Sequence, residues 1–402
     1  MAAKSNLGAA RAPNTLGLLK NHEADWMLQR TLAYMNVQAA EIGEVRTIAG
    51  QIDERDPESW PSAWSEVAGL VEAHGDKALA DGDQVAARQA FLRASNYFRA
   101  AEYGCVPSHP RFDELWERGV AAFRKAAVLF DPPVEAIEVP FEGAQLPGYF
   151  WRPEGTDTER PTLMVAGGND DTIEEDFLII GPAAVARGYN FFTFSYPGHR
   201  NAVHTDPAQV KRPDYEVPFA AALDVLQGLP GVDERIVAVI ANNPMIDYAR
   251  VADALLGPMI RRVPARLLRW AIDRKLAHDP MMRAYLEYGL WTAGYHDMGL
   301  YDWLHDPQAQ AHWARFAIAD DLERITCPAL SLVGAGEGEE MLTQTREYHD
   351  GIGSERKQMH VFTLEEDGSY DHCMLDNHSR MQQVTFAWLD ETLTALATTS
   401  NR

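Results

Sequence analysis

Cysteine is scarce in this sequence. Only Cys105, Cys327 and Cys373 occur in 402 residues, and none belongs to a C-x-x-C pair. This odd, widely spaced set argues against a disulfide framework and a zinc knuckle, and it is typical of a reducing compartment. No run of about 18 apolar residues occurs, and the first nineteen residues lack the apolar segment of a signal peptide. We therefore expect a cytoplasmic protein with no membrane partner.

Positive charge is also in short supply. The chain has 36 basic residues against 59 acidic ones, a formal net charge of −23. Such a field repels phosphate backbones, so nucleic acid is not an expected partner, and the acidic surface serves to keep the protein soluble.

Apolar residues are abundant: 46% of the residues are hydrophobic and 10% are aromatic. This composition predicts a globular protein with a large core and aromatic residues left over to line a pocket, and we expect its partner to be a small-molecule substrate. The composition does not decide whether the protein forms a homodimer.

The first third of the chain is predicted to be helical. After a loose tail at 1–20, the pattern of residues 21–133 is helical throughout. Apolar residues spaced three and four apart form one face of a helix that Gly104 ends: Ala87, Phe91, Ala94, Phe98 and Ala101. A second such face is formed by Phe112, Trp116, Phe123, Ala127 and Phe130. We therefore expect a helical N-terminal domain.

The sequence pattern changes after Pro133, from helical periodicity to alternating strands and helices. Residues 134–154 predict an antiparallel hairpin, and short apolar runs then alternate with helical segments. The expected strands lie at 162–168, 190–198, 235–242, 329–336 and 358–366, and the expected helices at 174–187, 214–228 and 340–350. This alternation predicts an α/β fold with a mostly parallel sheet, formed by 134–244 and 323–402. Residues 245–322 have no strand pattern and are expected to be a helical lid inserted into that core.

Polar residues follow three of the predicted strands. Gly167–Asp170 follow the first, Glu337 and Glu339 follow the fourth, and His372 follows the fifth. In open α/β sheets, catalytic groups lie beyond the carboxyl ends of the strands. An acid after one strand and a histidine after the next are the last two members of a nucleophile–acid–histidine triad. We expect the three segments to converge, with the His372 ring within hydrogen-bonding reach of Glu339 or Glu337.

A family resemblance rests on several of these segments. RASNYFRAAEY, VPFEGAQLPGYFWRPE, VAGGND, YPGHRN, GVDERI, ANNP, ITCPALSLVGAGEGEE and DHCMLDN occur in this order between about residues 85 and 395. Together they resemble the group of α/β-hydrolases that contains dihydroxypseudooxynicotine hydrolase, fungal heptaketide hydrolases and fermentation-respiration switch proteins. The resemblance implies cofactor-free hydrolysis of a carbonyl, aromatic or polyketide-type compound, with C–C bond cleavage among the family's reactions.

The resemblance also implies roles for individual residues. His372 matches the catalytic histidine, Glu339 occupies the position of the catalytic acid with Glu337 as the alternative, and Gly168 and Asn169 match the first part of the oxyanion hole. Polar residues near strand ends are candidates for substrate binding: Asp170, His199, Arg200, Tyr215 and Glu216. The residues around His372 lack the spacing of a metal site, and VAGGND is not a dinucleotide-binding fingerprint. No cofactor is therefore expected.

One element of the family is absent. No G-x-S-x-G elbow occurs in the sequence, and GVDERI continues directly as VAVIANNP, as if a strand, the elbow and a helix had been removed. Either the strand at 235–242 closes the sheet one strand short, or the fold is interrupted there. Ser195 and Ser331 lie on predicted strands, and Cys373 stands beside His372 without an elbow. We expect no serine on a tight turn beside His372.

The missing nucleophile leaves three functions open. The first is the hydrolase that the resemblance implies. The second is a lyase, isomerase or cyclase on the same scaffold, in which His372 is a general base and no covalent step occurs. The third is a degenerate binding protein, since a triad without its nucleophile retains little catalysis.

Overall fold

The computed structural model describes residues 11, 13, 15–155, 158–233, 235, 237–256 and 263–400. The chain divides into two compact units. The first comprises Gly17–Glu234 and Arg274–Leu300, and the second comprises Met1–Leu16, Arg235–Asp273 and Tyr301–Arg402. Each unit contains one β-sheet and its own helices.

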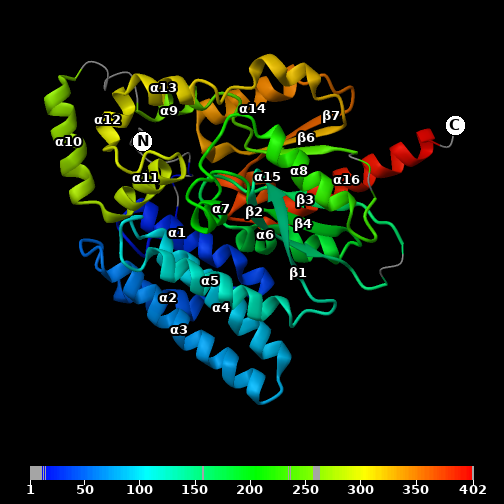
Figure 1. The fold of residues 1–402 in the computed structure, drawn as a ribbon, viewed down its shortest axis with the longest axis horizontal. Helices are drawn as coiled ribbons and strands as arrows, with labels where there is room; N and C mark the ends of the chain where they lie inside the picture. Colours follow the sequence, from blue (N-terminus) through cyan, green and yellow to red (C-terminus); the bar gives the residue numbers. More distant parts are fainter. Residues whose placement is uncertain are drawn as a thin grey trace. The chain divides into compact units, whose positions relative to one another are not determined.

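The first unit begins with helices α1 (His22–Leu32), α2 (Ile42–Gln51), α3 (Ser59–Ala80), α4 (Gln84–Tyr103) and α5 (Phe112–Ala127). Side-chain caps set two of the starts: Asn21 accepts a hydrogen bond from the Ala24 N–H, and Asp83 accepts one from the Ala86 N–H. Helix α4 lies between α3 and α5 (Figure 1). These helices fall within the range that the sequence predicted to be helical.

The predicted apolar face of α4 is confirmed. All five of its residues are completely buried: Ala87, Phe91, Ala94, Phe98 and Ala101. Gly104 ends the helix, and a side chain there would overlap the ring of Trp60. On α5, Phe112, Phe123 and Ala127 are buried and Trp116 is half-buried, whereas Phe130 lies beyond the end of the helix and is also half-buried.

The sheet of the first unit has four strands in the order β1-β2-β4-β3. They are β1 (Glu135–Phe141), β2 (Ala144–Trp151), β3 (Thr162–Val165) and β4 (Asn190–Phe194). Strands β1 and β2 form the predicted hairpin, and its turn residues Glu142 and Gly143 have φ values of 47° and 88°. Two positive φ angles are typical of the tight turns that match strand twist. Strand β4 pairs antiparallel with β2 and parallel with β3, so this sheet is mixed.

Helices α6 (Ile173–Val185), α7 (Arg200–Thr205) and α8 (Glu216–Gln227) follow the strands of this sheet. Phe192 and Phe194 of β4 pack in one apolar cluster with Leu226 of α8. Helix α11 (Pro280–Thr292) belongs to the same unit, although it comes from the segment predicted to be a lid.

The sheet of the second unit is parallel, with the order β5-β6-β7. Its strands are β5 (Val239–Asn242), β6 (Ala329–Gly334) and β7 (Lys357–Phe362). The remaining helices are α9 (Tyr248–Leu256), α10 (Ala265–Ala277), α12 (Leu300–His305), α13 (Pro307–Trp313), α14 (Glu339–Gly351), α15 (Leu364–Asp367) and α16 (His378–Ser400). Within the described residues, no helix is both long and apolar enough to cross a membrane.

The α/β class predicted from the sequence is confirmed, but the sheet differs from the prediction. A single sheet was expected, and the described strands form two. The strand predicted at 235–242 is reduced to β5, which pairs with β6. Strands β3 and β5 are edge strands of their sheets, and nearly all of their side chains are half-buried, whereas those of β4 and β6 are buried throughout. Each sheet therefore has a short, half-buried strand at one edge.

A buried ion pair connects the N-terminal helices to the sheet within the first unit. Arg30 of α1 donates two hydrogen bonds to Glu175 of α6, at 2.7 and 2.6 Å, and Tyr34 donates a third at 2.5 Å. Arg99 of α4 lies 3.5 Å from the same carboxylate. Burial raises the pKa of Glu175, but Arg30 and Arg99 outweigh it and lower the pKa to about 2. The carboxylate is thus ionised at neutral pH and fully paired.

Replacing Glu175 tests this connection. We expect Glu175→Gln to lower the free energy of unfolding at pH 7 by about 3–5 kcal/mol, because it leaves Arg30 buried without its counter-charge. The pKa of Glu175 is lower in the folded than in the unfolded chain, so its contribution is complete above about pH 4.5 and is lost as the pH falls towards 2. Urea denaturation of both proteins over this pH range measures the difference.

A matched control for this experiment is the exposed pair of Arg324 and Asp321, 2.9 Å apart. Asp321→Asn should change the free energy of unfolding by less than about 1 kcal/mol. Equal effects of Glu175→Gln and Asp321→Asn would contradict the importance of the buried pair.

Candidate active site

The second unit brings His372 and Glu337 together. His372 Nδ1 lies 2.9 Å from each of the two carboxylate oxygens of Glu337. The Glu337 side chain is completely buried, whereas 32% of the His372 side chain is exposed. The expected hydrogen bond between His372 and one of the two candidate acids is therefore confirmed, and its acceptor is Glu337.

The ends of two strands place this pair. Glu337 lies in a short 3-10 turn, Ala335–Glu337, directly after β6, and His372 begins a second turn, His372–Met374, after β7 and α15. Gly334 allows the two turns to meet, because a Cβ at this position would lie 2.5 Å from the carbonyl oxygens of Tyr370 and Asp371. The Gly336 N–H donates to the Tyr370 carbonyl at 2.8 Å. Backbone contact between the turns thus fixes the distance between the two side chains.

Glu339, the sequence-based choice for the acid, lies elsewhere. It is the first residue of α14, its side chain is 84% exposed, and its nearest cation is Arg346 at 3.7 Å. Gly338, with a φ of 94°, separates it from Glu337. A carboxylate in the first turn of a helix is favoured by the helix dipole, which accounts for Glu339 without a catalytic role.

The environment of His372 sets its proton affinity. Burial lowers the pKa of His372. Interactions with Cys373 and Glu337 raise it by a larger amount, so the pKa lies well above its usual value. Glu337 also accepts a hydrogen bond from the Cys373 N–H at 3.3 Å. A carboxylate at Nδ1 fixes the orientation of the imidazole ring.

The predicted oxyanion loop lies in the first unit. The Gly168 N–H donates to Asp171 Oδ2 at 2.7 Å, so it is engaged by a side chain. The Asn169 side chain accepts a hydrogen bond from Lys211 Nζ, and its carbonyl accepts one from the Tyr288 hydroxyl at 2.7 Å. The loop is therefore held by helix α11 and by the segment that follows α7.

His199 has partners of the types found in a catalytic triad. His199 Nε2 lies 2.8 Å from Asp171 Oδ1, and Nδ1 lies 2.9 Å from Ser195 Oγ. Ser195 Oγ also accepts a hydrogen bond from the Ala202 N–H at 2.7 Å. Ser195 and His199 are completely buried. The network therefore fixes the loop at Asp171 against β4 and α7.

Asp170 and Arg200, proposed from the sequence to contact substrate, share aromatic neighbours. Asp170 lies 3.2 Å from Arg30 and accepts a hydrogen bond from the Tyr103 hydroxyl at 3.2 Å. Arg200 pairs with the buried Glu102, and its guanidinium lies 4.1 Å from the centre of the Tyr288 ring and 5.4 Å from that of Tyr103. Asn169, Asp170 and Arg200 are thus joined through Tyr103 and Tyr288.

Tyr215 and Glu216 stand at the start of α8. Tyr215 is the N-cap residue, burial raises its pKa, and its ring centre lies 5.3 Å from that of Tyr196. Tyr196 donates a hydrogen bond to the Gly167 carbonyl at 2.6 Å, which links Tyr215 to the loop indirectly. Glu216 is exposed and is the first residue of the helix. Its position is that of an ordinary first-turn acid.

Two residues that the sequence did not indicate form hydrogen bonds to the loop at Gly168 and Asn169. Lys211 bonds the Asn169 side chain, and burial lowers its pKa to about 7, an effect that Asp170 partly opposes. Tyr288 comes from α11, more than a hundred residues away along the chain. Neither lies in a motif, and only tertiary contact reveals them.

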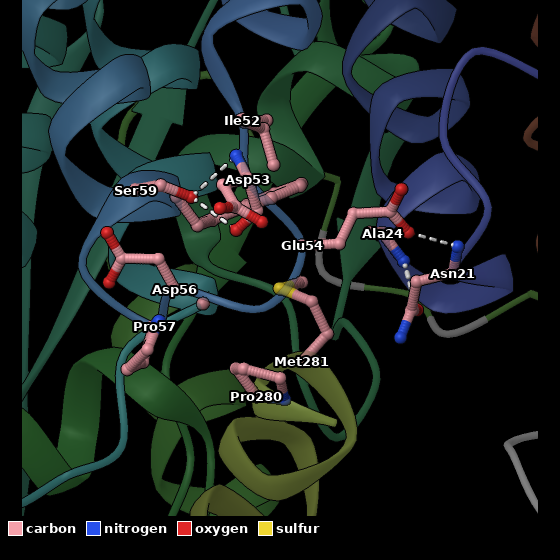
Figure 2. Close-up of a pocket in the computed structure, with 12 residues that line it drawn as sticks. Asn21, Ala24, Ile52, Asp53, Glu54, Asp56, Pro57, Ser59, Pro280 and Met281 are labelled. Carbon is pink, nitrogen blue, oxygen red and sulfur yellow. Dashed lines mark hydrogen bonds between the residues drawn. The ribbon is translucent and has the colours of Figure 1, made fainter. Parts of the chain in front are cut away.

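A separate small pocket lies among the helices of the first unit (Figure 2). Its lining includes Asn21, Glu54, Ser59 and Met281, and its volume is about 10 Å³. That is room for about one water molecule. The lining contains none of the site residues predicted from the sequence.

Comparison with known proteins decides the family. The alpha/beta hydrolase gkaG of Penicillium citrinum is 30% identical to this chain over 366 residues, covering 79% of this chain and 82% of that protein. The chain belongs to the α/β-hydrolase superfamily. The 20-hydroxy-prefusarin hydrolase FUS2 of Gibberella moniliformis is 35% identical over 302 residues, covering 66% of this hydrolase and 72% of its relative. Three other curated relatives align with it over about half of their own length, between 49% and 53%, whereas the hydrolase LUC6 of Fusarium sp aligns over 92% of its length.

Solved structures agree on the fold of this hydrolase. The 2,6-dihydroxy-pseudo-oxynicotine hydrolase superposes with a TM-score of 0.65 at 18% identity, covering 89% of this chain and 94% of that one. No protein-family model matches the chain. The resemblance drawn from the sequence is confirmed at the level of the superfamily.

The depressed pKa of Lys211 gives a testable prediction. Its folded-state pKa of about 7 lies below the ordinary 10.5, so the buried charge opposes folding fully below pH 7, and this effect disappears between pH 7 and 10.5. Lys211→Met removes the charge. We expect the stability of the variant relative to wild type to be highest at pH 6 and to decline up to pH 10. Melting temperatures across this range measure it, and a pH-independent difference would show that Lys211 keeps an ordinary pKa.

Proposed function

We propose that this α/β-hydrolase acts without a cofactor on a carbonyl compound of the polyketide or aromatic type, with His372 transferring protons and Glu337 orienting it. The hydrogen bond between His372 Nδ1 and the buried Glu337 carboxylate carries the proposal. The name of the relative FUS2, a 20-hydroxy-prefusarin hydrolase, supports a small organic substrate.

The pair suits acid–base chemistry in both directions. With a proton on Nδ1 held by Glu337, Nε2 accepts a proton from the attacking group and later returns it to the leaving group. Glu337 stabilises the imidazolium that forms in between. Because its carboxylate is buried and also bonded by the Cys373 N–H, it holds the ring in one orientation.

The loop at Gly168 and Asn169 remains our proposal for binding the developing oxyanion. In the structure the Gly168 N–H is bonded to Asp171, so that bond must open before Gly168 binds a substrate oxygen. Asp170, His199, Arg200, Tyr215 and Glu216 are retained as proposed substrate-binding residues. Among them Asp170 and Arg200 have the strongest support, since both lie close to Tyr103.

A lyase or cyclase would use the same pair, because proton abstraction by His372 needs no covalent step. Reaction in water labelled with oxygen-18 separates the two classes. Hydrolysis, including hydrolysis of a C–C bond, transfers one labelled oxygen to the product, whereas elimination or cyclisation transfers none.

The two candidate acids provide a matched pair of variants. We expect Glu337→Gln to lower kcat about 10²–10⁴-fold, because it removes the partner that orients His372 and stabilises its protonated form. Glu339→Gln should stay within about twofold, since an exposed carboxylate outside the hydrogen-bonding network contributes little. Turnover of a panel of aromatic and polyketide-type ketones and esters, followed by mass spectrometry, measures both. The reverse order of effects would return the role of the acid to Glu339.

No activated serine is expected. Ser195 is buried and bonded to His199, and the buried hydroxyl of Ser331 on β6 lacks a hydrogen-bond partner among the described residues. A fluorophosphonate probe, which labels activated serines, should therefore leave the intact mass of the folded protein unchanged. A stoichiometric adduct on a serine-containing peptide would restore a serine mechanism.

A further inference from the structure

The thiol of Cys373 occupies an unusual backbone position. Cys373 follows His372 in the turn after α15, and its φ and ψ are 50° and 22°. Met374 has a φ of 53°. Side chains larger than hydrogen seldom adopt this left-handed region, and such strain is concentrated at functional sites. Two successive residues in this region make a tight turn that presents the cysteine.

The neighbours of Cys373 are those that activate a thiol. Asn243 Nδ2 donates to Cys373 Sγ at 3.3 Å, and Cys373 is one of the two residues whose interactions raise the pKa of His372. Glu337 holds both residues, accepting from the Cys373 N–H and lying at His372 Nδ1. An imidazole and an amide donor beside sulfur are the neighbours found around nucleophilic cysteines.

Asn243 gives a second observation at the same place. It follows β5, has a φ of 53°, and is more than nine-tenths buried. Its Oδ1 has no hydrogen-bond partner among the described residues, although its Nδ2 is bonded to the thiol. A buried acceptor without a donor is costly, so a group outside the described residues is expected to donate to it. A hydroxyl of the substrate, or water, placed beside Cys373 Sγ fits this position.

We propose that Cys373 is the nucleophile of this hydrolase, with His372 as its acid–base partner, Glu337 as the orienting acid and Asn243 beside the sulfur. The assignment rests on the proposed function, since it supplies the group that the missing elbow would otherwise carry. Of the three cysteines, it selects the one beside the histidine.

The chemistry balances without a further reactant. The thiolate attacks the substrate carbonyl carbon, a C–S bond forms, and the carbonyl π electrons move to oxygen. The oxyanion then collapses, the bond to the leaving group breaks, and the His372 imidazolium protonates that group. Water attacks the resulting thioester and gives a proton to His372. The C–S bond breaks, the acid is released, and thiolate and imidazolium are restored.

The other two cysteines are internal controls. Burial raises the pKa of Cys105, with Glu102 adding to the effect, and burial also raises the pKa of Cys327. On wild-type protein at pH 6, iodoacetamide should alkylate Cys373 at least tenfold faster than half-buried Cys327, with site assignment by peptide mass spectrometry. His372→Ala should slow the alkylation of Cys373 by a similar factor. Alkylation of Cys373 no faster than that of Cys327 would overturn the proposal.

Turnover separates this proposal from the proposed function. Cys373→Gly is the variant of choice, because glycine tolerates the left-handed backbone and the fold should be retained. We expect it to lose activity at least a hundredfold, Cys327→Ala to lose none, and an acyl adduct to form on Cys373 in single-turnover reactions. If His372→Ala abolishes turnover but Cys373→Gly does not, the nucleophile assignment falls while the proposed function stands. If neither variant affects turnover, the proposed function falls as well.

Discussion

The candidate active site depends on one constraint, which is that the buried carboxylate of Glu337 must be satisfied. A carboxylate without access to water needs hydrogen-bond donors, and here these are the His372 ring and the Cys373 N–H. The same interaction therefore orients the histidine and holds the turn that contains the cysteine. Gly334 makes it possible by admitting the backbone of residues 370 and 371. Removing Glu337 should disturb both side chains together.

Much of the fold could be predicted because its signals are local. The α4 face and the β1–β2 hairpin are determined by spacing and by two turn residues, and both are present as predicted. The division into two sheets was not predictable from apolar runs, because a run does not reveal which strands pair. β3 and β5 have the composition of inner strands, yet each is the edge of its sheet. GVDERI continues as VAVIANNP where the resemblance led us to expect an elbow and a helix, and no local pattern indicates how the chain is arranged there.

The site was predictable in its residue types but not in its geometry. A histidine after one strand and an acid after another identified His372, but the choice between Glu337 and Glu339 depends on Gly338, where the chain turns with a φ of 94°. Glu337 lies before that turn and points to His372, whereas Glu339 lies after it and begins α14. The contact between Asn243 and Cys373 joins residues 130 apart in the sequence. Such contacts follow from the packing of strands and cannot be read from spacing.

Two of the histidine-centred networks among the described residues differ in their exposure. Asp171, His199 and Ser195 have the residue types and distances of a catalytic triad, but Ser195 and His199 are completely buried and the serine is bonded on both sides. In this structure the network holds the loop at Asp171 against the segment after β4, and the Ser195 hydroxyl is engaged by other groups of the chain. Glu337, His372 and Cys373 would take the same three roles in our proposal, and here a third of the His372 side chain is exposed and Cys373 is half-buried. Accessibility, more than the identity of the three residues, therefore favours the second network as the site of chemistry.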